Sequence, residues 1–312
     1  MTGRALSLLS SATLAATMIL GGGTASAEPA TAPPLAGAAL DVPGANDPSC
    51  VPSAERPDPV ILVHGTWADA ASTWATLAPA LADEGYCVYA INYGQRALLE
   101  PDNLLGLWGG ADIRHSAIEL AAFVDAVRER TGAARVDIVG HSQGGTLARQ
   151  YLKFEGGADL LEPSQNKVDH LVTLGATNHG TSYAEKQLLG KVAEAWGFPI
   201  QAAAAAAVGP SAVQQMAGSP FLEVLNAGGD TLPGIDYTVV ASRDDTVSTP
   251  PENTFLAAGP GARVENMWVQ DVCPGADVDH TALTTDPGAL WLTLRGLDPA
   301  YAEQTPLRCA TE

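Results

Sequence analysis

Residues 140 to 144 read Gly-His-Ser-Gln-Gly, a G-x-S-x-G pattern with Ser142 at its centre. The apolar run at residues 136–139 precedes the pattern, and residues with helical spacing follow it. Glycines allow a sharp strand-to-helix turn, because β-carbons at their positions would clash with neighbouring backbone. A serine on such a turn is exposed to substrate and suits attack on a carbonyl carbon. We therefore expect Ser142 to be a nucleophile.

A serine nucleophile needs a histidine to accept its proton and a carboxylate to orient that histidine. The chain has six histidines. His280 lies after the last predicted strand and near the C-terminus, where a strand-helix domain with this serine turn places its base. We expect His280 to be the general base. The alternative is that it is a histidine of a surface loop.

Three carboxylates are candidates for the partner of His280. Asp244 and Asp245 follow directly after a late predicted strand, where the orienting carboxylate belongs. Neighbours in an extended segment face opposite ways, so only one of the two can reach the histidine. We favour Asp245 and keep Asp244 as the alternative. Asp279, which adjoins the histidine in sequence, is the third candidate.

The negative oxygen formed during attack needs hydrogen-bond donors aimed at it. One expected donor is the backbone N–H of Gln143, the residue after the nucleophile. The other is the backbone N–H of Thr66, with its hydroxyl as a further candidate, because Gly65 allows a sharp turn after the first predicted strand. Trp67 and Trp74 are candidates to line the pocket, with core packing as the alternative reading for Trp74.

Short apolar runs alternate with helical patterns over most of the chain, which predicts a mostly parallel sheet with helices on both faces. The expected strands are residues 60–63, 88–91, 136–139, 170–174, 237–241 and 264–269. The expected helices are residues 72–84, 113–131, 145–154 and 211–226.

Two apolar insertions interrupt this alternation, at residues 94–111 and 177–209. Apolar insertions at the rim of an active site are candidate lids or walls for an acyl chain. The alternative is that they form ordinary helices of the core. The polar run at residues 178–181 is interpreted as loop structure with a role at the rim.

The first 27 residues resemble a secretory signal peptide, with Arg4, an apolar stretch at residues 5–20 and an Ala-Ser-Ala cleavage site. Residues 28–49 lack periodicity and are rich in alanine, proline and glycine, so we expect a flexible leader. Residues 50–312 then form one catalytic domain. No later segment is apolar enough to span a bilayer, and we expect a secreted, extracellular protein.

The chain is strongly acidic, with 16 Lys and Arg against 35 Asp and Glu. Loss of the signal peptide removes only Arg4, which leaves 15 basic residues and a formal charge of −20. Nucleic acids and anionic membranes repel such a surface, so neither is expected as a partner. No metal or dinucleotide motif occurs, and no cofactor is expected. Nothing in the sequence decides the oligomeric state.

Four cysteines are present, Cys50, Cys87, Cys273 and Cys309, and in an exported chain they predict two disulfides. Three pairings are possible. We favour Cys50 with Cys87 and Cys273 with Cys309, because these bonds tie both ends of the domain to its body. Zinc binding is the rival interpretation, but the chain lacks a C-x-x-C spacing.

The sequence resembles the secreted bacterial class 2 lipases and esterases of the α/β-hydrolase fold, and more distantly the yeast B-type lipase. The matching segments are residues 63–66, 140–145, 171–176, 214–229, 242–250 and 271–274 with 279–280. The resemblance implies Asp245 as the acid, Thr66 and Gln143 as oxyanion donors, and the favoured disulfides. Residues 274–278 form a shorter loop than is usual before the histidine, and the lid region is alanine-rich without a clear match.

The residues and the resemblance together predict a secreted serine carboxylic-ester hydrolase, a triacylglycerol lipase or esterase that forms an acyl-enzyme. Its substrate is a small-molecule or lipid ester. An acyltransferase, a polyester depolymerase and a thioesterase use the same three residues and stay open as alternatives. An inactive hydrolase fold used for binding is a further alternative.

Overall fold

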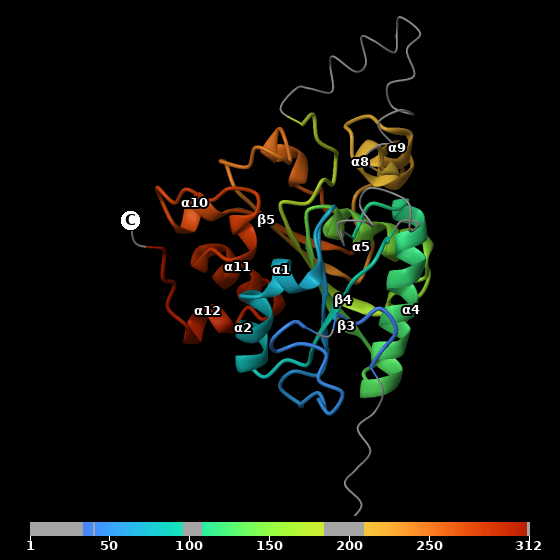
Figure 1. Cartoon of the computed structure of the whole chain (residues 1–312), viewed down its shortest axis with the longest axis vertical. Coiled ribbons are helices and arrows are strands. Elements are labelled where there is room, and N and C mark those ends of the chain that lie inside the picture. Colours follow the sequence, from blue (N-terminus) through green and yellow to red (C-terminus); the bar gives the residue numbers. More distant parts are fainter. Residues whose placement is uncertain (1–33, 40, 96–107, 184–208, 311–312) are drawn as a thin grey trace, which may run out of the picture. The chain divides into compact units, whose positions relative to one another are not determined.

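The computed structural model describes residues 34–39, 41–95, 108–183 and 209–310. Within them, six strands form one sheet in the order β2-β1-β3-β4-β5-β6, and every neighbouring pair is parallel (Figure 1). This confirms the predicted α/β class. The strands are β1 (Val60–Val63), β2 (Val88–Ile91), β3 (Val136–His141), β4 (Val168–Leu174), β5 (Asp236–Ala241) and β6 (Arg263–Trp268).

Helices cover both faces of the sheet because alternate strand residues point to opposite sides. Ile61 and Val63 pack into one apolar cluster, whereas Val60 and Leu62 pack into another. The first cluster includes α4 (Ile113–Thr131), α5 (Gln143–Phe154) and α9 (Pro220–Asn226). The second includes α1 (Ala70–Trp74), α2 (Leu77–Asp83), α10 (Val269–Val272) and α11 (Pro287–Leu297), which Figure 1 shows across the sheet from α4. None of the described helices is long and apolar enough to cross a membrane.

Two predicted helices are each divided in the structure. The expected helix at residues 72–84 is α1 followed by α2, because Pro79 has no N–H to continue a helix that starts earlier. The expected helix at residues 211–226 is α8 (Pro210–Gln214) followed by α9. Here Gly218 adopts a positive φ of 73° and Ser219 caps a new helix through its hydroxyl.

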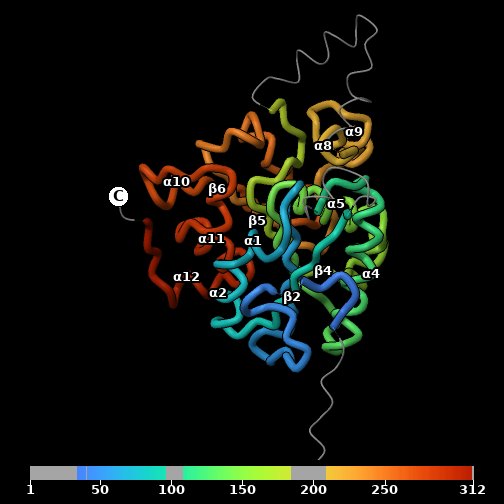
Figure 2. Tube along the Cα trace, in the orientation of Figure 1, coloured from blue at the N-terminus to red at the C-terminus, as the bar shows by residue number. Residues whose placement is uncertain are grey.

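Residues 34–39 and 41–49, the described part of the expected leader, run beside the edge strand β2 (Figure 2). Asn46 fixes this segment: its side chain donates to the carbonyls of Ala39 and Ala90 and accepts from the Ala90 N–H. Pairing of this kind satisfies backbone groups that an open sheet edge leaves exposed. The boundaries of signal peptide, leader and domain stay predictions, since residues 1–33 lie outside the described ranges.

Both favoured disulfides are present. Cys50 bonds Cys87 with a Cα–Cα distance of 5.7 Å, and Cys273 bonds Cys309 with a Cα–Cα distance of 5.5 Å. All four cysteines of the chain are used, so the zinc interpretation of these residues is wrong. In the chain-entropy model each bond of this loop length stabilises the fold by roughly 3–4 kcal/mol.

Candidate active site

Ser142 lies on the turn between β3 and α5, with a left-handed backbone at φ 54° and ψ −124°. A β-carbon on Gly144 would collide with the carbonyl oxygen of Val63, and one on Gly140 would lie 2.5 Å from the nitrogen of Gly145. Only glycine therefore fits on either side of the serine. The turn presents Ser142 at the carboxyl edge of the sheet, where ligands bind in open parallel sheets.

His280 lies on the loop after α10, and its Nδ1 is 2.7 Å from Oδ2 of Asp245. The other carboxylate oxygen of Asp245 accepts the backbone N–H groups of Val247 and Ser248, each at 2.8 Å. The carboxylate is thus held from two sides. Because Nδ1 donates to Asp245, the tautomer leaves Nε2 able to accept a proton.

The two rival carboxylates make other contacts. Asp244 accepts a hydrogen bond from Nε2 of Gln270 at 3.0 Å. Asp279 accepts the backbone N–H of Ala282 at 2.8 Å and the hydroxyl and N–H of Thr281 at 2.8 and 2.9 Å, and these bonds hold its pKa below the usual value. The structure therefore brings Asp245, of the three candidates, against the imidazole.

The remaining histidines occupy different environments. His64 is buried and stacks on Tyr93, and burial lowers its pKa to about 4. His141 is also buried, which lowers its pKa to about 3, and its Nε2 donates to the carbonyl of His280 at 2.9 Å. Both rings are therefore neutral near pH 7 and contribute to packing. His115 is exposed on α4, and His170 and His179 each bind an aspartate elsewhere.

Ser142 and His280 line one cavity of about 630 Å³. Threonine and serine residues make up many of its described lining residues, together with Trp67 and Val247, each 38% exposed. Trp74 is fully buried in the core instead. The sequence did not decide whether the Trp74 side chain lines the pocket or packs in the core, and the structure places it in the core. Most of both apolar insertions lies outside the described residues.

The two expected oxyanion donors, Thr66 and Gln143, are in direct contact. The Thr66 hydroxyl donates to Oε1 of Gln143 at 2.5 Å. Gly65 permits this approach, because a β-carbon there would lie 3.1 Å from the Ser142 β-carbon. The loop after β1 is therefore packed directly against the nucleophile turn. The backbone N–H groups of Thr66 and Gln143 belong to the two segments that meet at Ser142.

Two polar residues of this region were not predicted from the sequence as part of the site. Gln215, directly after α8, donates through Nε2 to the Thr66 hydroxyl at 2.8 Å. Thr177 donates its hydroxyl to Oε1 of Gln215 at 2.9 Å. Neither belongs to a short motif, and more than 70 residues separate Gln215 from Gln143. Only the fold brings them together, so the sequence carried no local signal for this contact.

Gly175, just after β4, packs closely against the Asp245–His280 pair. Its φ is 55°, and a β-carbon there would lie 3.0 Å from Oδ2 of Asp245 and 3.2 Å from Nδ1 of His280. Its carbonyl accepts the hydroxyl of Ser248 at 2.7 Å. Any larger residue would therefore press on the hydrogen bond between the carboxylate and the imidazole.

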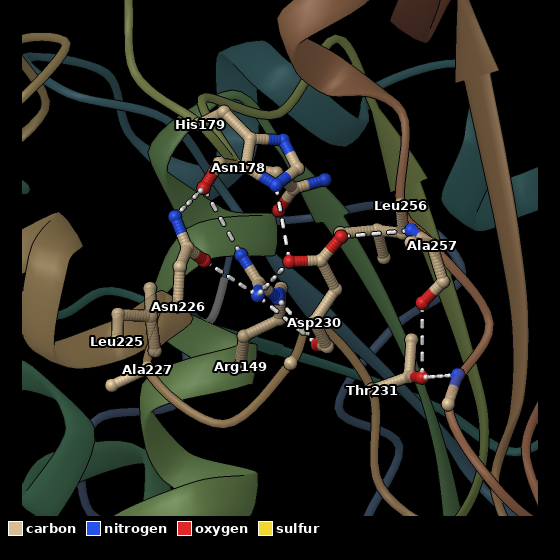
Figure 3. Close-up of polar contacts among 12 residues, drawn as sticks. Arg149, Asn178, His179, Leu225, Asn226, Ala227, Asp230, Thr231, Leu256 and Ala257 are labelled. Carbon is tan, nitrogen blue, oxygen red and sulfur yellow. Dashed lines mark hydrogen bonds and ion pairs between the residues drawn. The ribbon is translucent and has the colours of Figure 1, made fainter.

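A buried arginine anchors the loop that leads from β4 along the cavity (Figure 3). Arg149 of α5 donates to the carbonyl of Asn178 at 3.1 Å, to Oδ1 of Asn226 at 2.8 Å and to the carbonyl of Asp230. The carboxylate of Asp230 also binds Nε2 of His179 at 3.0 Å. Thr177 and Thr181, on the same loop, line the cavity, so the hydrogen bonds of Arg149 and Asp230 fix the loop that forms one wall of the cavity.

One group of possible metal ligands occurs in the described residues, formed by Asp137, Asp169 and His170 at the amino edge of the sheet. Arg135 already pairs with Asp169 at 2.5 Å, and Nδ1 of His170 bonds Asp137 at 3.0 Å. Protein cations thus already pair with the carboxylates of this group. The group is an ion-pair network, at the sheet edge opposite Ser142.

The family model for lipase (class 2) matches residues 57–272, more than half of the chain and a range that includes Ser142 and Asp245. The chain belongs to the class 2 lipases. This confirms the family and the α/β-hydrolase fold that the motifs predicted. The match ends before His280, so the position of the expected base rests on the geometry described above.

Solved structures agree on the fold of this class 2 lipase. It is similar to Aspergillus fumigatus lipase B with a TM-score of 0.57 and 21% identity over 85% of this chain and 62% of that one. It is also similar to the propeptide form of the Bacillus licheniformis lipase BlEst2, with a TM-score of 0.52 and 17% identity over 84% and 53%. The chain thus spans less than two thirds of the length of either relative.

Proposed function

We propose that this class 2 lipase is a secreted serine carboxylic-ester hydrolase that works through an acyl-enzyme. The observation that carries the proposal is the Asp245–His280 hydrogen bond on a cavity that His280 shares with Ser142. This combination supplies a nucleophile, a base of defined tautomer and space for a substrate. Family membership supports an ester as the substrate class.

In the proposed mechanism, Ser142 attacks the ester carbonyl while Nε2 of His280 removes its proton. Asp245 keeps the imidazole in the required tautomer and stabilises the imidazolium. The N–H groups of Thr66 and Gln143 stabilise the tetrahedral oxyanion, each such donor being worth about 10²–10³ in rate. The imidazolium then protonates the leaving alcohol, and water releases the acyl group by the same route.

The proposed substrate is a triacylglycerol or a simpler carboxylic ester. Hydrolysis of p-nitrophenyl esters from acetate to palmitate, with Ser142→Ala as the control, tests the reaction and the acyl length together. We expect turnover by the parent enzyme and a fall in kcat of about 10⁴–10⁶ in the variant. Activity weighted to long chains supports a lipase, whereas activity confined to short chains supports an esterase. Unchanged activity of Ser142→Ala overturns the proposal.

Secretion is part of the proposal. A signal peptide at residues 1–27, a leader at 28–49 and a catalytic domain at 50–312 form the proposed organisation. The two disulfides support it, since such bonds persist in oxidising compartments. N-terminal sequencing of protein recovered from the culture medium tests it. A mature chain beginning at Glu28 is expected, and retention of the intact chain inside the cell contradicts secretion.

A further inference from the structure

The side chain of Gln215 hydrogen-bonds to the side chains of both Thr66 and Gln143. It is 2% exposed and lines the cavity that holds Ser142. Its Nε2 lies 2.8 Å from the Thr66 hydroxyl, 3.3 Å from Oε1 of Gln143 and 3.1 Å from the carbonyl of Ser211. One buried amide therefore ties α8 to the loop after β1 and to the nucleophile turn.

The hydrogen bonds around Gln215 run in a single direction. An amide oxygen only accepts, so Thr177 donates to Oε1 of Gln215, and the Thr177 hydroxyl accepts in turn from Thr146 at 2.9 Å. An amide nitrogen only donates, so the Thr66 hydroxyl accepts a hydrogen bond from Gln215 and donates one to Gln143. Hydrogen bonds aligned in this way strengthen one another in a buried site.

We propose that Gln215 is a positioning residue that holds the oxyanion hole in its working geometry. The inference rests on the proposed function, because it concerns the two donors assigned there. Gln143 depends on this contact: its own Nε2 is buried without a hydrogen-bond partner in the described part of the chain. Thr66 and Gln215 thus hold the side-chain amide of Gln143, the residue whose backbone N–H is the second expected donor.

Preorganised donors stabilise a transition state because they need no reorientation during the reaction. A displacement of about 1 Å in such a group can cost about 10²-fold in rate. Loss of Gln215 is therefore expected to affect the chemical step more than substrate binding. A residue that only stabilises the fold would lower the melting temperature and leave kcat of the folded enzyme unchanged.

The first test compares Gln215→Leu with Gln214→Leu. Gln214 is its neighbour in sequence, and its side chain accepts the N–H of Ile113 at 2.9 Å, away from the cavity lining. Both variants lose buried hydrogen bonds and are expected to melt lower. Only Gln215→Leu is expected to lose kcat, by about 10- to 100-fold with KM changed less than about threefold. Equal kcat values for parent and Gln215→Leu overturn the proposal.

The second test uses Gln215→Glu, which keeps the shape of the side chain. A protonated carboxyl can donate to Thr66, whereas an ionised one cannot and also places negative charge beside the developing oxyanion. The ratio of variant to parent kcat is expected to fall by at least about tenfold from pH 5 to pH 8. Dividing the variant kcat by the parent kcat at each pH removes the pH effects that both enzymes share through the other ionisable residues of the cavity lining, His141, Tyr183, Asp279 and His280. A pH-independent ratio overturns the positioning role.

Thr177→Val is the variant to use if the Gln215 substitutions prevent folding. It removes only the hydroxyl that orients the Gln215 amide, and a fall in kcat of about three- to tenfold is expected. Unchanged kcat contradicts the proposal.

Ser142→Ala separates this inference from the proposed function. If Ser142→Ala keeps parental activity, the ester-hydrolase assignment fails. If it is inactive while Gln215 and Thr177 variants match the parent, only the positioning role fails.

Discussion

Two aspartate–histidine pairs lie at opposite edges of the same sheet. At the carboxyl edge, Nδ1 of His280 is 2.7 Å from Asp245, and at the amino edge, Nδ1 of His170 is 3.0 Å from Asp137. The first pair opens on the cavity that contains Ser142, whereas the second lies among charged groups that include Arg135 and Asp169. The pairs are alike, so their surroundings must decide what each can do.

In the amino-edge pair, burial and the neighbouring charges shift the pKa values of both partners. Burial raises the pKa of Asp137 to about 6. Burial also lowers the pKa of His170, but the hydrogen bond and charge of Asp137 outweigh this effect and raise it to about 8. The pair is an ion pair near pH 7 and joins the first residues of β3 to those of β4.

The largest expected difference between the pairs is in catalysis. Asp245→Asn keeps the shape of the side chain but no longer holds His280 in the tautomer with its proton on Nδ1. We therefore expect kcat to fall by about 10⁴. Asp137→Asn is expected to keep kcat within about twofold, although it weakens the amino-edge pair. Steady-state ester hydrolysis by both purified variants measures this contrast. Similar losses in the two would mean that the pairs act through stability alone.

A smaller effect is expected from the glycine beneath the carboxyl-edge pair. Gly175→Ala adds a methyl group about 3 Å from Asp245 and His280, so kcat is expected to fall by about 10- to 100-fold. Gly132→Ala is the matched control, since Gly132 also has a positive φ, 72°, but open space around it. Both variants bear backbone strain of about 1 kcal/mol. Equal kcat values in the two would show that the pair tolerates the intrusion.

The smallest expected effect is on stability at the amino edge. The folded pKa of His170, about 8, is above its reference value of 6.5, so its stabilising contribution is complete below pH 6.5 and is lost as the pH rises through 8. The loss amounts to about 2 kcal/mol. Urea unfolding of the parent between pH 6 and 9 should show it, and His170→Asn should not. The same pH dependence in that variant would assign the effect to other groups.

The sequence predicted those parts of the molecule that depend on local pattern. The six strands and the turn around Ser142 follow from apolar runs and glycines, and each strand is found within two residues of its expected position. Pro79 and Gly218 signalled that each of the two long predicted helices would be divided, but the helical spacing of the apolar residues favoured a single helix in each case. The helix α11 was missed, although Asp286 and Pro287 mark its start as a cap and a first-turn proline.

The contacts around the candidate site could not be predicted from the sequence, because they depend on the three-dimensional fold. Gln215 and Thr177 reach Thr66 and Gln143 only because α8 and the loop after β4 fold over the same cavity. Such contacts join residues far apart in the chain, and no spacing rule encodes them. Alternation allowed only one of Asp244 and Asp245 to reach the histidine, and the resemblance selected Asp245. Its contact with His280 is a property of the three-dimensional arrangement.

Covalent labelling by a fluorophosphonate tests the central claim most directly, because the reagent reacts with an activated serine and forms a stable adduct. One adduct per chain is expected, mapped by peptide mass spectrometry to Ser142. The adduct should be absent in Ser142→Ala and should form far more slowly in Asp245→Asn, but at the parental rate in Asp137→Asn. Labelling at another residue, or none in the active folded enzyme, would contradict the account.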